Sequence, residues 1–159
     1  MNGAQIHLLA NHLPVLGAAF AAALTAAGLV LRKDDVVKAG LWSFVASALL
    51  ALPAYFSGEE AEDVIEHLPG VLESIIHDHE EAAEKALIAV LLLGGAALGT
   101  LIWAMRRGAL SRKACAGVLA LSVPVLGLLS WTAHLGGLVR HTELRSGAPA
   151  APVPDSDRD

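Results

Sequence analysis

The sequence has little of what soluble domains and nucleic-acid-binding proteins contain. Only 4 % of its 159 residues are aromatic, and Cys115 is its single cysteine, which excludes a disulfide framework and a cluster of thiolate ligands. The net charge is −5, so the basic surface that nucleic acid requires is missing. No phosphate-binding loop, dinucleotide fingerprint or nucleophile with a paired base is present, so no motif indicates an enzyme.

Charged residues are absent from four long apolar runs, which cover residues 13–31, 39–56, 86–105 and 114–135. A hydrocarbon core about 30 Å thick is crossed by about 20 apolar residues in an α-helix, and each run is close to that length. None of the runs alternates between apolar and polar residues as the strands of a membrane barrel do. The sequence therefore predicts an all-α integral membrane protein whose domain, residues 1–144, is a four-helix bundle in a lipid bilayer.

Small residues are frequent in the first and third runs. The third run contains a GxxxG pattern, Gly95 and Gly99, with Gly94 beside it. Small side chains let helix backbones approach each other closely in lipid. We therefore predict that these two helices pack tightly inside the bundle.

Positive charge is concentrated in the two short connections, residues 32–38 and 106–113. By the positive-inside rule both connections face the cytoplasm, which places both termini on the periplasmic or extracellular side of a bacterial inner membrane. The longer connection, residues 57–85, is then an extracytoplasmic loop. Its helix-forming residues, interrupted at Pro69, predict a short helix and then a second helix that runs into the third span. The proline-rich tail, residues 145–159, is predicted to be disordered.

All seven histidines fall on the predicted outer side, together with most of the carboxylates. Helical phase separates two of them: His79 shares an apolar face with Ile75 and Ile76, whereas His77 points to water. An inward-facing imidazole needs a partner, and either a metal or a hydrogen bond to a neighbouring helix end supplies one. Candidates from four segments converge if the bundle closes. The predicted ligands are His12, His67, His79, His141 and Glu80, and their predicted neighbours are Glu60 and Arg140.

Two kinds of cofactor fit these ligands. Haem b would take one or two histidines as axial ligands, whereas iron, zinc or manganese would bind imidazole and carboxylate together. The scarcity of aromatic residues and the lack of a histidine deep within a span count against haem. The glutamates beside an inward-facing histidine favour a non-haem metal. His7 and His134 are interpreted instead as side chains at the membrane interface.

Several motifs resemble a family of small bacterial four-helix membrane proteins. They are "NHLPV", "GEEAEDVIEHLPGV", "HEEAA" and "LGGLVRHTEL", which are spread over most of the chain up to Leu144. The family pattern has isoleucine where Val139 stands here, and it does not include His77 or His134. The residues that match it are His12, His67, His79, Glu80, Arg140 and His141. The resemblance implies a membrane protein with polar residues gathered at one face, some of whose relatives serve redox systems.

These observations predict a membrane protein with a haem or metal site at its outer face that serves electron transfer. The alternative is a non-catalytic accessory subunit that packs against a larger respiratory or photosynthetic complex. Besides the lipid bilayer, the expected partners are a larger membrane protein complex or further copies of the same chain. A metal-ion transporter is disfavoured because transporters place ionisable residues near the bilayer midplane, where these spans have none.

Overall fold

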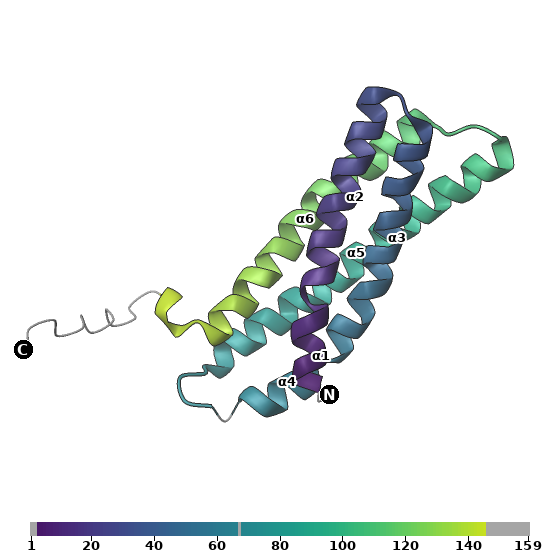
Figure 1. The fold of residues 1–159 in the computed structure, drawn as a ribbon. Helices are drawn as coiled ribbons and strands as arrows, with labels where there is room; N and C mark the ends of the chain where they lie inside the picture. Colours follow the sequence, from purple (N-terminus) through teal and green to yellow (C-terminus); the bar gives the residue numbers. More distant parts are fainter. Residues whose placement is uncertain (1–2, 67, 146–159) are drawn as a thin grey trace, which may run out of the picture.

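The computed structural model describes residues 3–66 and 68–145. Four long helices lie side by side (Figure 1). They are α2 (His12–Leu31), α3 (Asp34–Phe56), α5 (Glu73–Arg107) and α6 (Arg112–Arg140). All four are long and apolar enough to cross a membrane. The predicted all-α class, with four helices long and apolar enough to cross a membrane, is therefore confirmed, and the apolar helices indicate a lipid bilayer as their environment.

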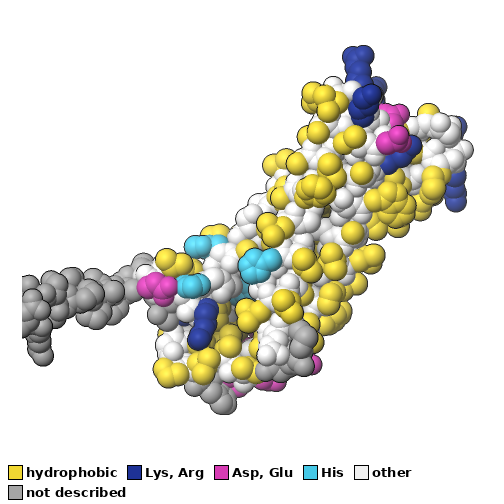
Figure 2. Space-filling view, viewed as in Figure 1, with side chains coloured by type: hydrophobic (Ala, Val, Ile, Leu, Met, Phe, Trp, Pro, Cys, Tyr) yellow, Lys and Arg dark blue, Asp and Glu magenta, His cyan; other side chains and the backbone are white. Residues whose placement is uncertain are grey.

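The four helices form a closed ring in which each contacts two neighbours, in the order α2, α3, α5 and α6. Nearly fully buried apolar side chains fill its centre. The largest are Val37, Leu41 and Phe44 from α3 and Val90 and Leu93 from α5. They recur every three or four residues, which places them on one face of each helix. The outer faces carry exposed apolar side chains along the length of the bundle (Figure 2), as contact with lipid requires.

Glycines allow α2 and α3 to approach each other closely. A Cβ on Gly40 of α3 would lie 2.7 Å from the backbone nitrogen of Thr25, and a Cβ on Gly28 of α2 would lie 2.6 Å from the backbone nitrogen of Val37. Both obstacles are backbone atoms, which cannot rotate away as a side chain can. Side chains at these two positions would therefore force the helices apart.

In α5 the close contact is made by Gly94. A Cβ at this position would lie 2.5 Å from the Cβ of Ala48 in α3. Gly95 and Gly99, the GxxxG pair, face elsewhere, and nothing lies within 4 Å of a Cβ built at either position. The tight packing predicted for this helix is thus made by Gly94, because helical phase turns the GxxxG pair away from α3.

Two short helices cover one end of the bundle. The first is α1 (Gly3–Ala10), which joins α2 through Asn11, whose backbone stays in the right-handed helical region (φ −60°, ψ −29°). Helical structure therefore begins well before the predicted start at residue 13. The second is α4 (Gly58–Ile65), which follows α3 and packs against α1. After α4 the chain turns and then continues through α5 without a further break, as the sequence predicts.

The far end of α6 leads into a single helical turn, η1 (Thr142–Leu144), and is held by Arg145. The Arg145 guanidinium donates hydrogen bonds to the carbonyls of Leu138 and Val139, each at 2.9 Å, and to the carbonyl of Gly70 at 2.6 Å. The first residue of the predicted disordered tail therefore ties α6 to the turn before α5. The rest of that tail, residues 146–159, lies outside the described residues.

Candidate metal site at the histidine-bearing end

One end of the bundle carries the histidines that the structure describes, and the other carries most of the described lysines and arginines (Figure 2). At the histidine-bearing end, ahead of the apolar segment of α5, His79 shares the inner face of this helix with the buried Ile76 and Ala82. Its Nδ1 is 3.0 Å from the carbonyl oxygen of Thr132 in α6. Burial lowers the pKa of the His79 imidazole below its ordinary value. Burial therefore favours the neutral form of the ring.

His7 approaches His79 from α1. The Nδ1 of His7 donates a hydrogen bond to the carbonyl of Ala54 at 2.9 Å and lies 3.5 Å from the Oγ of Ser57. The Ser57 hydroxyl donates its own hydrogen to the carbonyl of Pro53 at 2.7 Å, so it accepts from the imidazole. The ring centroids of His7 and His79 are 6.5 Å apart, and the ring planes are at 90° to each other. The end of α3 thus positions His7 beside His79.

The hydrogen bonds determine which nitrogen of each ring holds the lone pair. A backbone carbonyl only accepts, so a neutral imidazole that is bonded to one through Nδ1 carries its proton there. In the neutral form of either ring the lone pair is then on Nε2. Metal-binding histidines are commonly oriented in this way, by a carbonyl that accepts from the nitrogen not bound to the metal. His7 and His79 are therefore two candidate ligands, each oriented by another helix.

A further polar group lies one helical turn from His7. Asn11 follows His7 by four residues, so the two side chains lie on the same face of a continuous helix. The Oδ1 of Asn11 is buried and has no hydrogen-bond partner within residues 3–66 and 68–145. A buried amide oxygen without a partner is costly, and a metal ion or a metal-bound water would supply one. Asn11 is thus a candidate third donor.

The histidine pair fits a single metal ion better than it fits haem. A tetrahedral ion with metal–nitrogen bonds of about 2.0 Å brings two imidazole centroids to about 5 Å, so these rings would move together by about 1 Å. Haem needs a gap between helices, yet a Cβ on Gly136 of α6 would lie only 2.9 Å from the Cε1 of His79. In the part of the chain that the structure describes, no group of three His, Cys, Asp or Glu could hold a metal. Water or Asn11 would complete the coordination.

The structure does not bring the other predicted histidine ligands to this pair. His12 is exposed on the outer face of α2. His141 is exposed at the end of α6, where its Nδ1 lies 2.8 Å from the Oε1 of Glu143. His67 lies outside the described residues. His77, predicted to point to water, is exposed, and its Nε2 lies 3.7 Å from the Oε1 of Glu81.

The two residues predicted to neighbour the ligands, Glu60 and Arg140, contact another helix or are exposed. Glu60 of α4 packs against Gly3 of α1, and Arg140 is exposed on α6. Glu80 shares a hydrogen bond with Glu62 of α4, a residue that is not among the predicted site residues. Sequence reasoning therefore missed His7, Asn11 and Glu62. Extending the helical period backward from α2 would have placed the first two on the inner face.

The carboxyl groups of Glu62 and Glu80 form a proton-dependent link between α4 and α5, next to His79. Their hydrogen bond is the main reason why the pKa of Glu62 rises to about 7, and burial and repulsion from Glu80, Glu66 and Asp63 raise it further. Two carboxylates side by side repel each other unless one keeps its proton. The link is therefore intact below about pH 7 and is lost above it.

We expect α4 to be held less firmly on α5 as the pH rises. The pKa of Glu62 is about 7 when α4 is docked, against 4.5 for an ordinary glutamate. The docked state therefore binds more protons between these values and loses relative stability as the pH rises through them. Hydrogen exchange of the α4 amides, corrected for the intrinsic pH dependence, should show protection falling several-fold between about pH 5 and 7.5.

The substitution Glu62→Gln should remove this pH dependence, because the amide donates to Glu80 at every pH. Glu59→Gln is the matched control, since Glu59 is exposed on the same helix and is not among the groups that shift the pKa of Glu62. An unchanged pH profile in Glu62→Gln would show that the carboxyl pair does not hold α4.

No family of known proteins, no curated protein and no solved structure is significantly similar to this chain. What it does is therefore inferred from its own residues and their geometry.

Proposed function

We propose that the protein binds one transition-metal ion between His7 and His79 and that this ion serves electron transfer at the membrane. Of the three predicted metals, zinc has no redox chemistry, so iron or manganese fits an electron carrier. The positive-inside rule supports placing this end on the periplasmic or extracellular side of a bacterial inner membrane.

The observation that carries the proposal is the anchoring of both imidazoles through Nδ1. His7 is held by the carbonyl of Ala54 and His79 by the carbonyl of Thr132, at 2.9 and 3.0 Å. Each Nε2 is thereby left as the nitrogen that carries the lone pair, on two rings 6.5 Å apart. Two imidazoles oriented in this way would supply two nitrogen ligands for one metal ion.

The bound ion would supply a change of oxidation state, and the chain supplies the surroundings. His7 and His79 would hold the ion as neutral nitrogen donors, and the lowered pKa of His79 keeps protons from competing at neutral pH. The buried Oδ1 of Asn11 would hold the ion or a water bound to it. The nearby carboxylates Glu62 and Glu80 add negative charge, which favours a cation.

The test is a titration of the detergent-purified chain with Fe²⁺ under anaerobic conditions, together with elemental analysis of the protein as purified. We expect one ion per chain, and an affinity at least about 100-fold lower in His7→Ala and in His79→Ala, because each loses a ligand. His12→Ala and His77→Ala are the matched controls, since both histidines are exposed at the same end of the bundle.

Three results would overturn the proposal. The first is the absence of stoichiometric binding of iron or manganese. The second is a loss of affinity in the control variants equal to that in His7→Ala and His79→Ala. The third is a Soret band in the purified protein, which would identify haem instead. Far-UV circular dichroism of each variant shows whether the bundle is still folded, so a loss of binding is not mistaken for unfolding.

A further inference from the structure

The other end of the bundle carries a groove between α3 and the end of α5. Its volume is about 370 Å³, and its lining includes Asp34, Lys38, Trp42, Leu101 and Met105. Most of this lining is apolar and continues the lipid-facing surface, where Trp42 and Met105 are 51 % and 69 % exposed. Lys38 and Asp34 lie where α3 begins. The groove is therefore apolar along the bundle and charged at its mouth.

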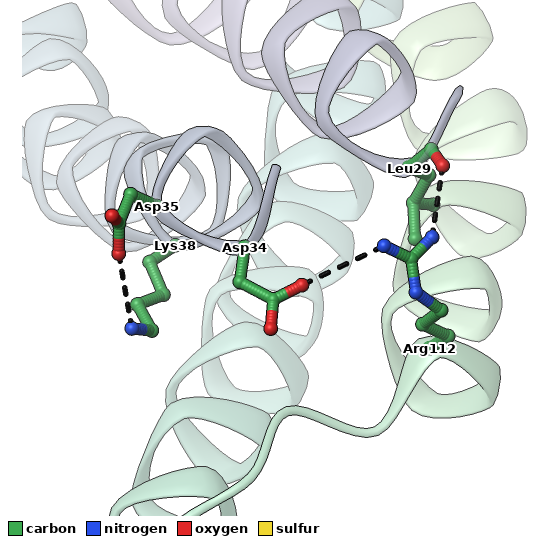
Figure 3. A network of polar contacts seen from close by, with 5 residues as sticks. All are labelled: Leu29, Asp34, Asp35, Lys38 and Arg112. Atoms are coloured by element: carbon green, nitrogen blue, oxygen red, sulfur yellow. Dashed lines mark hydrogen bonds and ion pairs between the residues drawn. The ribbon is translucent and has the colours of Figure 1, made fainter. Parts of the chain in front are cut away.

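Positive charge exceeds negative charge around this mouth. Both carboxylates at the mouth are already paired with a cation (Figure 3). The Nη2 of Arg112 lies 3.6 Å from the Oδ1 of Asp34, and the Nη1 of Arg112 donates to the carbonyl of Leu29 at 2.9 Å. The Nζ of Lys38 lies 3.2 Å from the Oδ1 of Asp35. Asp35 is almost fully exposed, so its pairing with Lys38 is weak and readily exchanged. The remaining cations of the two short connections are Arg32, Lys33, Arg106, Arg107 and Lys113.

Aromatic residues mark the same level of the bundle. The guanidinium of Arg107 lies 4.7 Å from the centre of the Trp103 ring, and Trp103 is 54 % exposed. Tryptophan and arginine in this arrangement are typical of the boundary between lipid tails and headgroups. A groove at this depth meets a headgroup at its mouth and an acyl chain along its length.

We propose that this groove binds an anionic phospholipid, with an acyl chain along Trp42, Leu101 and Met105 and the phosphate at Lys38. Basic pockets between membrane-spanning helices commonly recognise acidic headgroups. The apolar lining favours a phospholipid over free phosphate, which has no chain to fill it. The excess of cations favours an anionic headgroup over a zwitterionic one. The proposal does not depend on the metal site, nor on which side of the membrane this end faces.

Tryptophan quenching by brominated lipid tests it directly on the full chain in nanodiscs. A protein with Trp103→Phe and Trp131→Phe keeps Trp42 as its reporter in the groove. Brominated phosphatidylglycerol should quench Trp42 with a relative affinity about fivefold above that of brominated phosphatidylcholine. A protein that keeps Trp131 alone, at the histidine-bearing end, should show a ratio near one.

Lys38→Gln should lower the preference at Trp42 at least twofold, whereas Lys85→Gln, which removes a lysine at the opposite end, should not. A ratio near one at Trp42 in the parent would overturn the proposal, as would an equal ratio with and without Lys38. A preference that millimolar inorganic phosphate abolishes would identify a phosphate site and overturn the lipid assignment. A preference for phosphatidylglycerol at Trp42 that persists in phosphate and falls in Lys38→Gln supports the proposal.

Discussion

Replacing Gly40 with leucine is expected to destabilise the bundle by about 3 kcal/mol or more, because α2 and α3 are too close at this point to admit a side chain. A Cβ on Gly40 would lie 2.7 Å from the nitrogen of Thr25 and 3.0 Å from the carbonyl oxygen of Ala21, and it would also meet the Thr25 hydroxyl oxygen. Two of these three atoms are backbone, so only a separation of the helices relieves the contact. Unfolding in mixed micelles with increasing dodecyl sulfate measures the loss.

Gly95→Leu and Gly99→Leu are the matched controls. Both are in a membrane-spanning helix, like Gly40, but nothing lies within 4 Å of a Cβ at either position. We expect their free energies of unfolding to stay within about 0.5 kcal/mol of the parent. Equal destabilisation by all three leucines would show that the GxxxG pattern, and not the contact at Gly40, governs packing in this bundle.

The four long apolar helices could be predicted from the sequence because the signal is compositional. Each apolar run is long enough to cross the hydrocarbon core without a charge, and only a helix satisfies the backbone of such a run in lipid. The contact between α5 and α3 was harder to predict. The sequence does not show which glycine of α5 makes the contact. In the structure Gly94 faces Ala48, while Gly95 and Gly99 face elsewhere. The rotation of a helix about its axis depends on its partners.

Half of the histidine pair was predictable, and the reason lies in helical phase. His79 was placed inward because Ile75 and Ile76 beside it define an apolar face. His7 was missed because the first helix was expected to begin at residue 13, so no helical phase was assigned to the residues before it. Because α1 and α2 are nearly continuous through Asn11, the buried face of α2, which begins at Pro14, extends back along α1 to His7. The same phase turns His12 outward.

The carboxyl pair depends on tertiary structure that no local pattern encodes. On its own helix Glu62 falls on the side that an amphipathic α4 presents to water. It meets Glu80 only because the chain turns between Ile65 and Glu73 and returns beside itself. The direction of such a turn is set by contacts at both ends, here those of α4 with α1 and of Arg145 with Gly70. Sequence spacing alone does not supply this direction.

Replacing Gly136 with alanine should weaken metal binding about 10-fold to 100-fold without removing a ligand. The new Cβ would lie 2.9 Å from the Cε1 of His79 and 3.3 Å from its Nδ1. The imidazole can move aside, so the bundle should stay folded. The movement would displace Nδ1 from the carbonyl of Thr132, which orients the ring. The Fe²⁺ titration measures the affinity, and the side-chain ¹⁵N resonances of His79 report the loss of its fixed tautomer without any metal.

Gly137→Ala separates this effect from the general consequences of an added methyl group. The two glycines are adjacent in α6 and gain the same helix propensity from alanine, about 1 kcal/mol, but nothing lies within 4 Å of a Cβ at position 137. Affinity should therefore fall in Gly136→Ala and stay unchanged in Gly137→Ala. If Gly136→Ala alters the His79 resonances and leaves the affinity intact, the ring does not bind the ion. If neither changes, α6 does not lie against His79 as the structure has it.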